Sequence, residues 1–220
     1  MTRFGKMLVN LLFPAKCILC NEIIHASREE ICDSCRAALT RPTVSVKLDY
    51  IEGVVAATEY DAVREAIIRL KFKGQHWLSE PLGELVAEAV ADKLSGRFDA
   101  ITYAPLSEKR LKKRGYNQAQ LLAEVAGVRL ELPVVETLRK TKETVANSSL
   151  SGDDSRELRR KNVAEAYEAL SGVEGRRLLL VDDVLTTGAT MSECARTLLL
   201  GGAESVVCAT VALADSGKDR

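Results

Sequence analysis

A run of apolar residues that ends in two adjacent carboxylates constrains the fold of this 220-residue chain more than any other feature. Residues 178–181 show no alternation of apolar and polar side chains, which is typical of a parallel strand buried on both faces. Residues 191–200 then have the spacing and composition of a helix. We therefore predict that residues 185–190 form a turn joining a buried strand to a helix, the repeating unit of an α/β fold.

The predicted turn carries groups that suit a phosphate. Small and hydroxylated residues fill it: Thr186, Thr187, Gly188, Ala189 and Thr190. Free amides and the positive dipole end of a helix N-terminus attract anions, and a glycine lets backbone approach the ligand. Asp182 and Asp183 come just before the turn, at the edge where open α/β sheets bind ligands, and carboxylates there can accept hydrogen bonds from two vicinal hydroxyls. A ribose 5-phosphate satisfies both halves of this arrangement.

Two other kinds of α/β site contain a similar strand and turn, and the sequence lacks their signatures. A P-loop NTPase needs an upstream G-x-x-x-x-G-K-[ST], and a dinucleotide site needs G-x-G-x-x-G. Neither motif occurs in the chain. The remaining alternative is a buried strand whose acidic end is only a solvated turn.

Four cysteines near the N-terminus form a second motif. Cys17 and Cys20 make one C-x2-C pair, and Cys32 and Cys35 make another after eleven intervening residues. Four thiolates in this spacing can reach the tetrahedral geometry of zinc, at about 2.3 Å per bond. Disulfides and iron–sulfur ligation are the alternatives, and a reducing cytoplasm favours metal over disulfides. Because four thiolates leave no position open for water, we predict a structural zinc site.

The composition and the N-terminal segment agree with a cytoplasmic protein. The 31 basic and 31 acidic residues give a formal charge of zero, so the whole chain has no electrostatic preference for nucleic acid or membrane. Residues 1–13 imitate a lipoprotein signal, but Asn10 interrupts the apolar stretch, and Lys16 stands where cleavage needs a small residue. We expect a short amphipathic helix there instead. No segment reaches the about 20 apolar residues that a membrane span needs.

The middle of the chain alternates between strand and helix patterns. Further strands are predicted at residues 54–60, 98–103, 134–138 and 205–212, and helices at 62–71, 81–94, 117–126 and 156–170. Residues 140–156 are polar, and we expect a mobile loop there. Such alternation implies a parallel sheet flanked by helices. The predicted domains are a helix and zinc module at residues 1–45 and an α/β domain at 46–215.

A basic stretch follows the strand predicted at 98–103, so it should also lie at the ligand-binding edge. After Pro105 and Leu106 come five cations within six positions: Lys109, Arg110, Lys112, Lys113 and Arg114. Several cationic donors suit a pyrophosphate, which arginine can bind through two nitrogens. A solvated basic face and a single-stranded DNA contact are the alternatives. The DNA contact is weakly indicated, because only Tyr116 is aromatic nearby and Trp77 is remote in sequence.

Taken in order along the chain, these motifs resemble the ComF family. The resemblance spans about residues 14–212 and rests on the cysteine pairs, Leu70-Lys-Phe-Lys-Gly74, Pro105-Leu106 with Arg110, Arg114-Gly-Tyr-Asn-Gln-Ala119, Asn162-Val163 and the stretch 182–190. It implies a zinc-binding module joined to a type I phosphoribosyltransferase domain, which binds 5-phosphoribosyl-1-pyrophosphate (PRPP). Several members of that family are associated with natural competence, the uptake of DNA.

The resemblance implies roles for individual residues. Asp182 and Asp183 would hold the ribose hydroxyls as the catalytic pair, and magnesium would bind with PRPP. The PRPP-binding residues would be Thr186, Thr187, Gly188, Ala189, Thr190, Pro105, Leu106, Arg110 and Arg114. The acceptor and its general base are not indicated. A PRPP-responsive regulator without transferase activity, or a protein that handles single-stranded DNA with competence proteins as partners, fits the same motifs.

Overall fold

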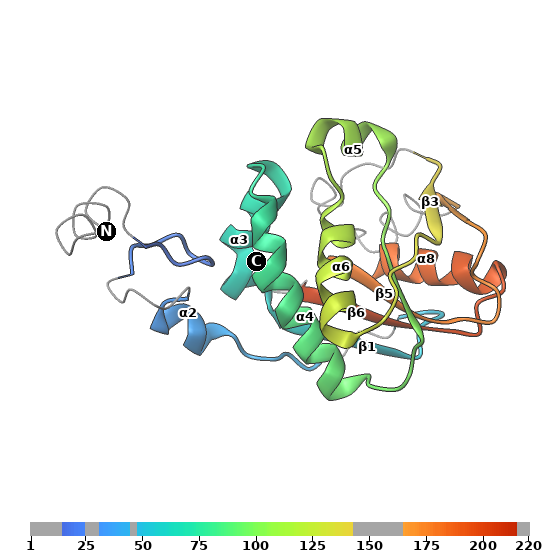
Figure 1. Ribbon diagram of the computed structural model, residues 1–220, viewed down its shortest axis with the longest axis horizontal. Coiled ribbons are helices and arrows are strands. Elements are labelled where there is room, and N and C mark those ends of the chain that lie inside the picture. The colour runs from blue at the N-terminus through green and yellow to red at the C-terminus, as the bar shows by residue number, and fades with distance from the viewer. Residues whose placement is uncertain (1–14, 25–30, 45–47, 143–164, 215–220) are drawn as a thin grey trace.

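The computed structural model describes residues 15–24, 31–44, 48–142 and 165–214 (Figure 1). The amphipathic helix expected at residues 1–13 lies outside this part of the chain. So do most of the loop expected at 140–156 and the first part of the helix predicted at 156–170. Among the described residues, no helix is both long and apolar enough to cross a membrane.

A four-stranded parallel sheet is the centre of the fold. In spatial order its strands are β1 (Gly53–Glu59), β6 (Ser205–Leu213), β5 (Arg177–Leu185) and β2 (Ala100–Tyr103). The central strands β5 and β6 are buried along most of their length, which accounts for their unbroken apolar runs. The parallel pairing confirms the predicted α/β class.

Each face of the sheet has its own apolar core, because successive residues of a strand point to opposite faces. Leu179 and Val181 of β5 pack in the core with α3 (Tyr60–Phe72), α4 (Ser79–Lys93) and α6 (Gln118–Leu130). Leu178 and Leu180 pack in the other core, with α8 (Ala189–Leu200). Helices therefore cover both faces, as the alternating pattern predicted (Figure 1).

A two-stranded antiparallel sheet corrects one prediction. Its strands are β3 (Leu138–Lys140) and β4 (Tyr167–Ala169), so residues 167–169 are a strand and not the end of the helix predicted at 156–170. That stretch is rich in strong helix formers, and tertiary pairing overrides such propensities. The strand predicted at 134–138 is also wrong in extent, because Val134 makes a single parallel bridge to Ile101 and β3 begins only at Leu138.

Three short helical elements were not predicted. They are α2 (Asp33–Ala38), the 3-10 turn η1 (His76–Leu78) and α5 (Glu108–Arg114). Neither α2 nor α5 has a buried residue, so neither carries the apolar periodicity that identifies a helix in a sequence. Figure 1 shows α2 and residues 15–24 on the same side of the molecule as α3, away from the sheet.

Candidate functional site

The carboxyl ends of the parallel strands bring separate parts of the sequence to one edge of the sheet. There β1 runs into α3, β2 runs into the segment before α5, and β5 runs into α8. Open α/β sheets bind their ligands at this edge. The turn 186–188, the acidic pair and the basic stretch all lie along it, as the sequence predicted.

The turn after β5 forms the N-terminus of α8. Gly188 is the N-cap, with a φ of 75° that favours glycine, and the side chain of Leu48 occupies the space that a Cβ would need. A glycine is therefore required here by the backbone conformation and by the packing of Leu48. The sequence alone did not indicate the contact with Leu48. The first amides of α8 have no intrahelical partner. Thr187 Oγ1 is buried and has no hydrogen-bond partner within the described part of the chain. Its hydroxyl can therefore donate a hydrogen bond to an oxygen of a bound anion.

The two carboxylates at the end of β5 belong to different faces of the sheet. Asp183 continues the face of Leu179 and Val181, whereas Asp182 continues the opposite face. Asp183 is only 4% exposed, and its Oδ2 lies 2.5 Å from Lys71 Nζ. The backbone amide of Asp183 donates to Asp182 Oδ1 at 2.8 Å.

The ionised form of Asp182 is disfavoured in the folded protein. Removal from water and the charge of Asp183 together raise the pKa of Asp182 to about 7, although Lys71 acts in the opposite direction. Lys71 and Arg114 are cations whose charges act on this pair. A bound cation, or hydroxyls that donate hydrogen bonds, would stabilise the doubly ionised pair.

Lys71 is a site residue to which the sequence assigned no role. It lies in the last turn of α3, and its side chain is 22% exposed. Asp183 Oδ2 has no hydrogen bond of suitable direction among the described residues, so its contact with Lys71 is a charge pairing. The only signal in the sequence was the place of Lys71 in the motif 70–74.

The segment between β2 and α5 is held against α6. Asn117 Nδ2 donates to the carbonyl of Ala104 at 3.0 Å, and Asn117 Oδ1 accepts from the amide of Ala119 at 3.0 Å. Pro105 and Leu106 are partly exposed beside this anchor. Ser107 Oγ is buried and lacks a hydrogen-bond partner in the described ranges. The segment therefore presents a second unsatisfied hydroxyl at the same edge of the sheet.

The basic stretch forms α5 and sends Arg114 toward the acids. Enclosure lowers the pKa of Arg114, while the nearby charges of Asp183 and Asp182 raise it. Its guanidinium carbon lies 5.3 Å from the centre of the Phe72 ring. Arg110 is close enough to act on the pKa of Arg114. By contrast, Lys112 is 81% exposed and pairs with Glu108 at 3.6 Å, so it faces solvent.

Tyr167 of β4 is a second residue that sequence reasoning missed, since its segment was predicted as a helix. Lys140 Nζ donates to Tyr167 Oη at 3.3 Å and lies 5.1 Å from the centre of the ring. Burial raises the pKa of Tyr167, the negative charge of Asp182 raises it further, and a hydrogen bond with Thr190 lowers it. The small sheet therefore lies close to Thr190 at the start of α8 and to Asp182, on the α8 face of the main sheet.

The four N-terminal cysteines come together as predicted. The sulfurs of Cys17, Cys20, Cys32 and Cys35 all lie within 4.8 Å of one another. Cys20 Sγ and Cys32 Sγ are 3.8 Å apart, and a tetrahedron with zinc–sulfur bonds of about 2.3 Å has edges of about 3.8 Å. The amide of Cys32 also donates to Cys17 Sγ at 3.4 Å. The donor set and spacing fit a structural zinc ion.

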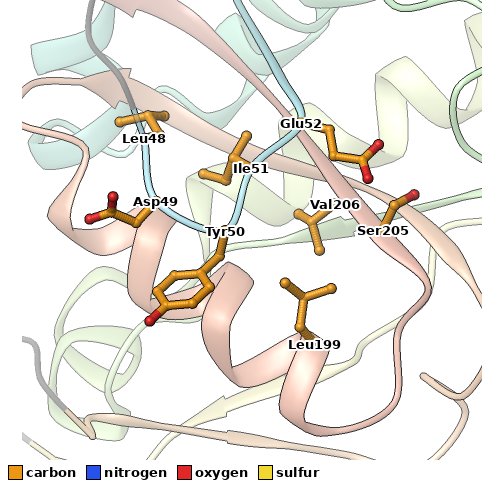
Figure 2. Close-up of a pocket in the computed structure, with 8 residues that line it drawn as sticks. All are labelled: Leu48, Asp49, Tyr50, Ile51, Glu52, Leu199, Ser205 and Val206. Carbon is orange, nitrogen blue, oxygen red and sulfur yellow. The ribbon is translucent and has the colours of Figure 1, made fainter.

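A pocket of ≈ 580 Å³ lies at the other end of the sheet (Figure 2). Its lining consists of Leu48, Asp49, Tyr50, Ile51, Glu52, Leu199, Ser205 and Val206. Ser205 and Val206 begin β6, and Glu52 directly precedes β1, so the pocket is at the amino ends of the strands. Because parallel sheets bind ligands at the opposite edge, we do not place the functional site in this pocket.

Known proteins match both parts of the chain. The model of the family described as phosphoribosyl transferase domain matches residues 83–220, and that of the double zinc ribbon domain matches residues 8–46. Residues 8–46 contain four cysteines, and the other two, Cys194 and Cys208, are buried in the sheet core. The ribbon region of this chain therefore has thiolates for one four-cysteine site.

Three curated relatives cover most of the chain. Competence protein F of Haemophilus influenzae is 29% identical, over 88% of this chain and 95% of that protein. DNA utilization protein YhgH of Escherichia coli K12 is 31% identical, over 70% and 69%. Competence protein ComFC of Streptococcus pneumoniae is 27% identical, over 86% and 84%. With its zinc ribbon, its parallel sheet and these matches, the chain belongs to the phosphoribosyl transferase domain family and, within it, to the ComF-like competence and DNA utilization proteins.

Proposed function

We propose that this protein binds PRPP together with magnesium at the carboxyl edge of its sheet and transfers the phosphoribosyl group to an acceptor. The observation that carries the proposal is the convergence of three groups at that edge. These are an acidic pair in which the pKa of Asp182 is raised to about 7, a helix N-terminus with an unsatisfied hydroxyl at Thr187, and Arg114 of the basic helix α5.

Each part of PRPP has a matching set of residues. The 5-phosphate would be bound by the turn made of Thr186, Thr187, Gly188, Ala189 and Thr190. The ribose 2- and 3-hydroxyls would donate to Asp182 and Asp183. The pyrophosphate would lie against Arg110 and Arg114 and the segment that begins with Pro105 and Leu106. A related ribose 5-phosphate would share the first two sets.

The acidic pair also fits magnesium, which prefers carboxylate oxygens and retains several waters. When bound, magnesium would neutralise part of the charge on the departing pyrophosphate. In the transfer, the bond from C1 of the ribose to the pyrophosphate oxygen breaks, and its electron pair leaves with the pyrophosphate. The acceptor then forms a bond to C1 and loses a proton. Asp182 and Asp183 would favour the positive ribose, and the α5 arginines would favour the leaving group.

Calorimetric titration with PRPP and magnesium tests this proposal. The double substitution of Asp182→Asn and Asp183→Asn should weaken PRPP binding by at least about 100-fold, because the hydroxyl acceptors lose their charge. Asp92→Asn is a matched control, since that carboxylate pairs with Arg41 on an exposed surface. Unchanged affinity in the double variant would refute the site. Binding without pyrophosphate release in the presence of candidate bases or amines would assign a regulator rather than a transferase.

A second candidate function, contact with single-stranded DNA, is favoured by one feature of the surface. Trp77 is remote from α5 in sequence, but the neighbouring His76 lies 6.1 Å from the Tyr116 ring, edge to face. Phe72 and Trp77 are 72% and 51% exposed. Aromatic groups thus lie next to the basic helix α5, a combination that binds single strands by stacking and phosphate pairing. The names of the relatives concern competence and DNA utilization, in agreement with this candidate.

Fluorescence anisotropy with a labelled oligothymidine tests the second candidate. Affinity should fall steeply as salt rises, because bound phosphates release counterions. Trp77→Ala should weaken binding at every salt concentration, whereas Lys112→Ala should mainly flatten the salt dependence. An affinity that does not change with salt would refute this function. We further propose a cytoplasmic location, since a reducing compartment keeps the four thiolates available for zinc.

A further inference from the structure

The last turn of α3 joins the zinc module to the candidate site. Four consecutive residues in it contact four different partners. Arg69 donates to the carbonyls of the two residues between the first two cysteines, and the Leu70 carbonyl accepts from the Tyr116 hydroxyl. Lys71 pairs with Asp183, and the Phe72 ring lies under Arg114. Ile18 and Leu19 also pack in the same apolar core as Leu70.

Arg69 is the link on the side of the zinc module. It is 5% exposed, and its guanidinium donates to the carbonyl of Ile18 and, at 3.1 Å, to that of Leu19. It also donates to Asn21 Oδ1 and Gln75 Oε1, both at 3.3 Å. Ile18 and Leu19 are the two residues between Cys17 and Cys20. A buried guanidinium is costly unless its donors are satisfied, so Arg69 depends on the shape of this short loop.

Lys71 is the link on the side of the site. Two residues along a helix correspond to a rotation of about 200°, so Arg69 and Lys71 leave the helix in nearly opposite directions. Arg69 points to the cysteine pair, and Lys71 points to Asp183. A shift of this turn therefore moves both contacts together.

We infer that the zinc module supports the candidate site through this turn, with Arg69 as a positioning residue that sets Lys71 against Asp183. The part of the inference that concerns ligand affinity rests on the proposed PRPP site. Zinc fixes the backbone between Cys17 and Cys20, because so short a module cannot fold by apolar burial alone. Without zinc the carbonyls of Ile18 and Leu19 lose their fixed positions, Arg69 loses its partners, and the turn that carries Lys71 loosens.

The first test needs no PRPP. Full-length protein is treated with acetic anhydride, and acetylation of each lysine is followed by mass spectrometry before and after zinc is removed with a chelator. The contact with Asp183 at 2.5 Å and the partial burial of the side chain shield the Lys71 amine from the reagent, so its acetylation should rise at least about fivefold on zinc removal. Lys112, which is exposed and remote from the cysteines, should react at the same rate in both states. An unchanged rate at Lys71 would overturn the inference, whether or not PRPP binds.

The second test separates positioning from a general loss of structure. PRPP affinity is measured for Arg69→Met, Lys71→Met and the double variant, with zinc content and thermal unfolding recorded for each. Arg69→Met should weaken binding about fivefold in the wild-type background and have no further effect in the Lys71→Met background. Fully independent effects would overturn the inference. Arg97→Met, which removes a guanidinium paired with Glu52, should leave affinity unchanged.

The inference can still be tested if Arg69→Met does not fold or if the wild-type protein does not bind PRPP. If Arg69→Met does not fold, Arg69→Lys keeps the positive charge but loses most donors, and it should show the same raised reactivity of Lys71. If the wild-type protein does not bind PRPP, the proposed function fails. The acetylation of Lys71 then still decides whether the zinc module and Asp183 are coupled.

Discussion

The two edges of the parallel sheet differ in chemistry more than in shape. The amino edge has a pocket of ≈ 580 Å³ but no unsatisfied buried hydroxyl among its described lining residues. At the carboxyl edge, Ser107 and Thr187 have buried hydroxyls without partners, and Asp182 has a raised pKa. These unsatisfied polar groups and the raised pKa of Asp182, and not the size of a hollow, are the reason that we propose the ligand site at the carboxyl edge.

A pair of glycines, one at each edge, offers the largest expected effect on stability. Gly188 and Gly96 both have a φ of 75°, but only at Gly188 would a Cβ meet another side chain, that of Leu48. Gly96→Ala should cost about 1 kcal/mol from backbone strain, and Gly188→Ala about 2 to 4 kcal/mol, because overpacking adds to the strain. Urea unfolding measures both. Equal losses would show that Leu48 moves aside without cost.

The raised pKa of Asp182 predicts a stability difference that depends on pH. Its carboxyl holds its proton more tightly in the folded protein, where its pKa is about 7, than in the unfolded chain, where its pKa has the ordinary value of about 3.9. The protonated carboxyl of Asp182 therefore contributes its full stabilisation of the folded protein below pH 4, and this stabilisation is lost as pH rises through 7. Without ligand, Asp182→Asn should be more stable than wild type by about 2 kcal/mol at pH 8 and by much less at pH 4.5.

The control for this substitution lies at the amino edge. Asp99 accepts from the amide and the side chain of Arg177 at 3.3 and 3.4 Å. Asp99→Asn should therefore slightly lower stability at pH 8, the opposite sign to Asp182→Asn. If Asp182→Asn raised the free energy of unfolding equally at both pH values, the raised pKa of Asp182 would not be the cause.

The unsatisfied hydroxyl of the turn can be tested against a threonine hydroxyl outside it. Thr187→Val should leave the stability of the free protein within about 0.5 kcal/mol, because the hydroxyl has no partner to lose, and should weaken PRPP binding about tenfold. Thr197 lies toward the end of α8 that is remote from the turn, and its hydroxyl donates to the carbonyl of Glu193 at 2.8 Å. Thr197→Val should leave PRPP affinity unchanged in the same calorimetric titration. Equal affinities for the two variants would remove Thr187 from the site.

The smallest expected effect is at the amino-edge pocket. Tyr50 is 54% exposed there and its ring lines the pocket, so Tyr50→Ala removes part of the pocket wall (Figure 2). PRPP affinity should change by less than about twofold, because a surface substitution that touches no ligand has only a small effect. A loss comparable to that of Thr187→Val would show that the ligand reaches the amino edge.

The sequence predicted those parts of the site that depend on neighbours along the chain. The strand, the acidic pair and the turn follow one another directly, and the two cysteine pairs have the spacing of a metal site. Lys71 could not be assigned, because its pairing with Asp183 joins residues far apart in sequence. Tyr167 was hidden by helix-forming neighbours that strand pairing overrides. The proximity of η1 to Tyr116 likewise exists only in the folded chain.

The opposite orientation of Asp182 and Asp183 divides the site between two layers of the protein. Asp183 meets Lys71 on the layer that rests on the zinc ribbon, whereas Asp182 acts on Tyr167 on the layer formed by the small antiparallel sheet. A single strand thereby gives each layer one acid of its own. If PRPP binds as proposed, substitutions in the small sheet should change the contacts to the sugar on the Asp182 side and leave the pairing of Asp183 with Lys71 as it is.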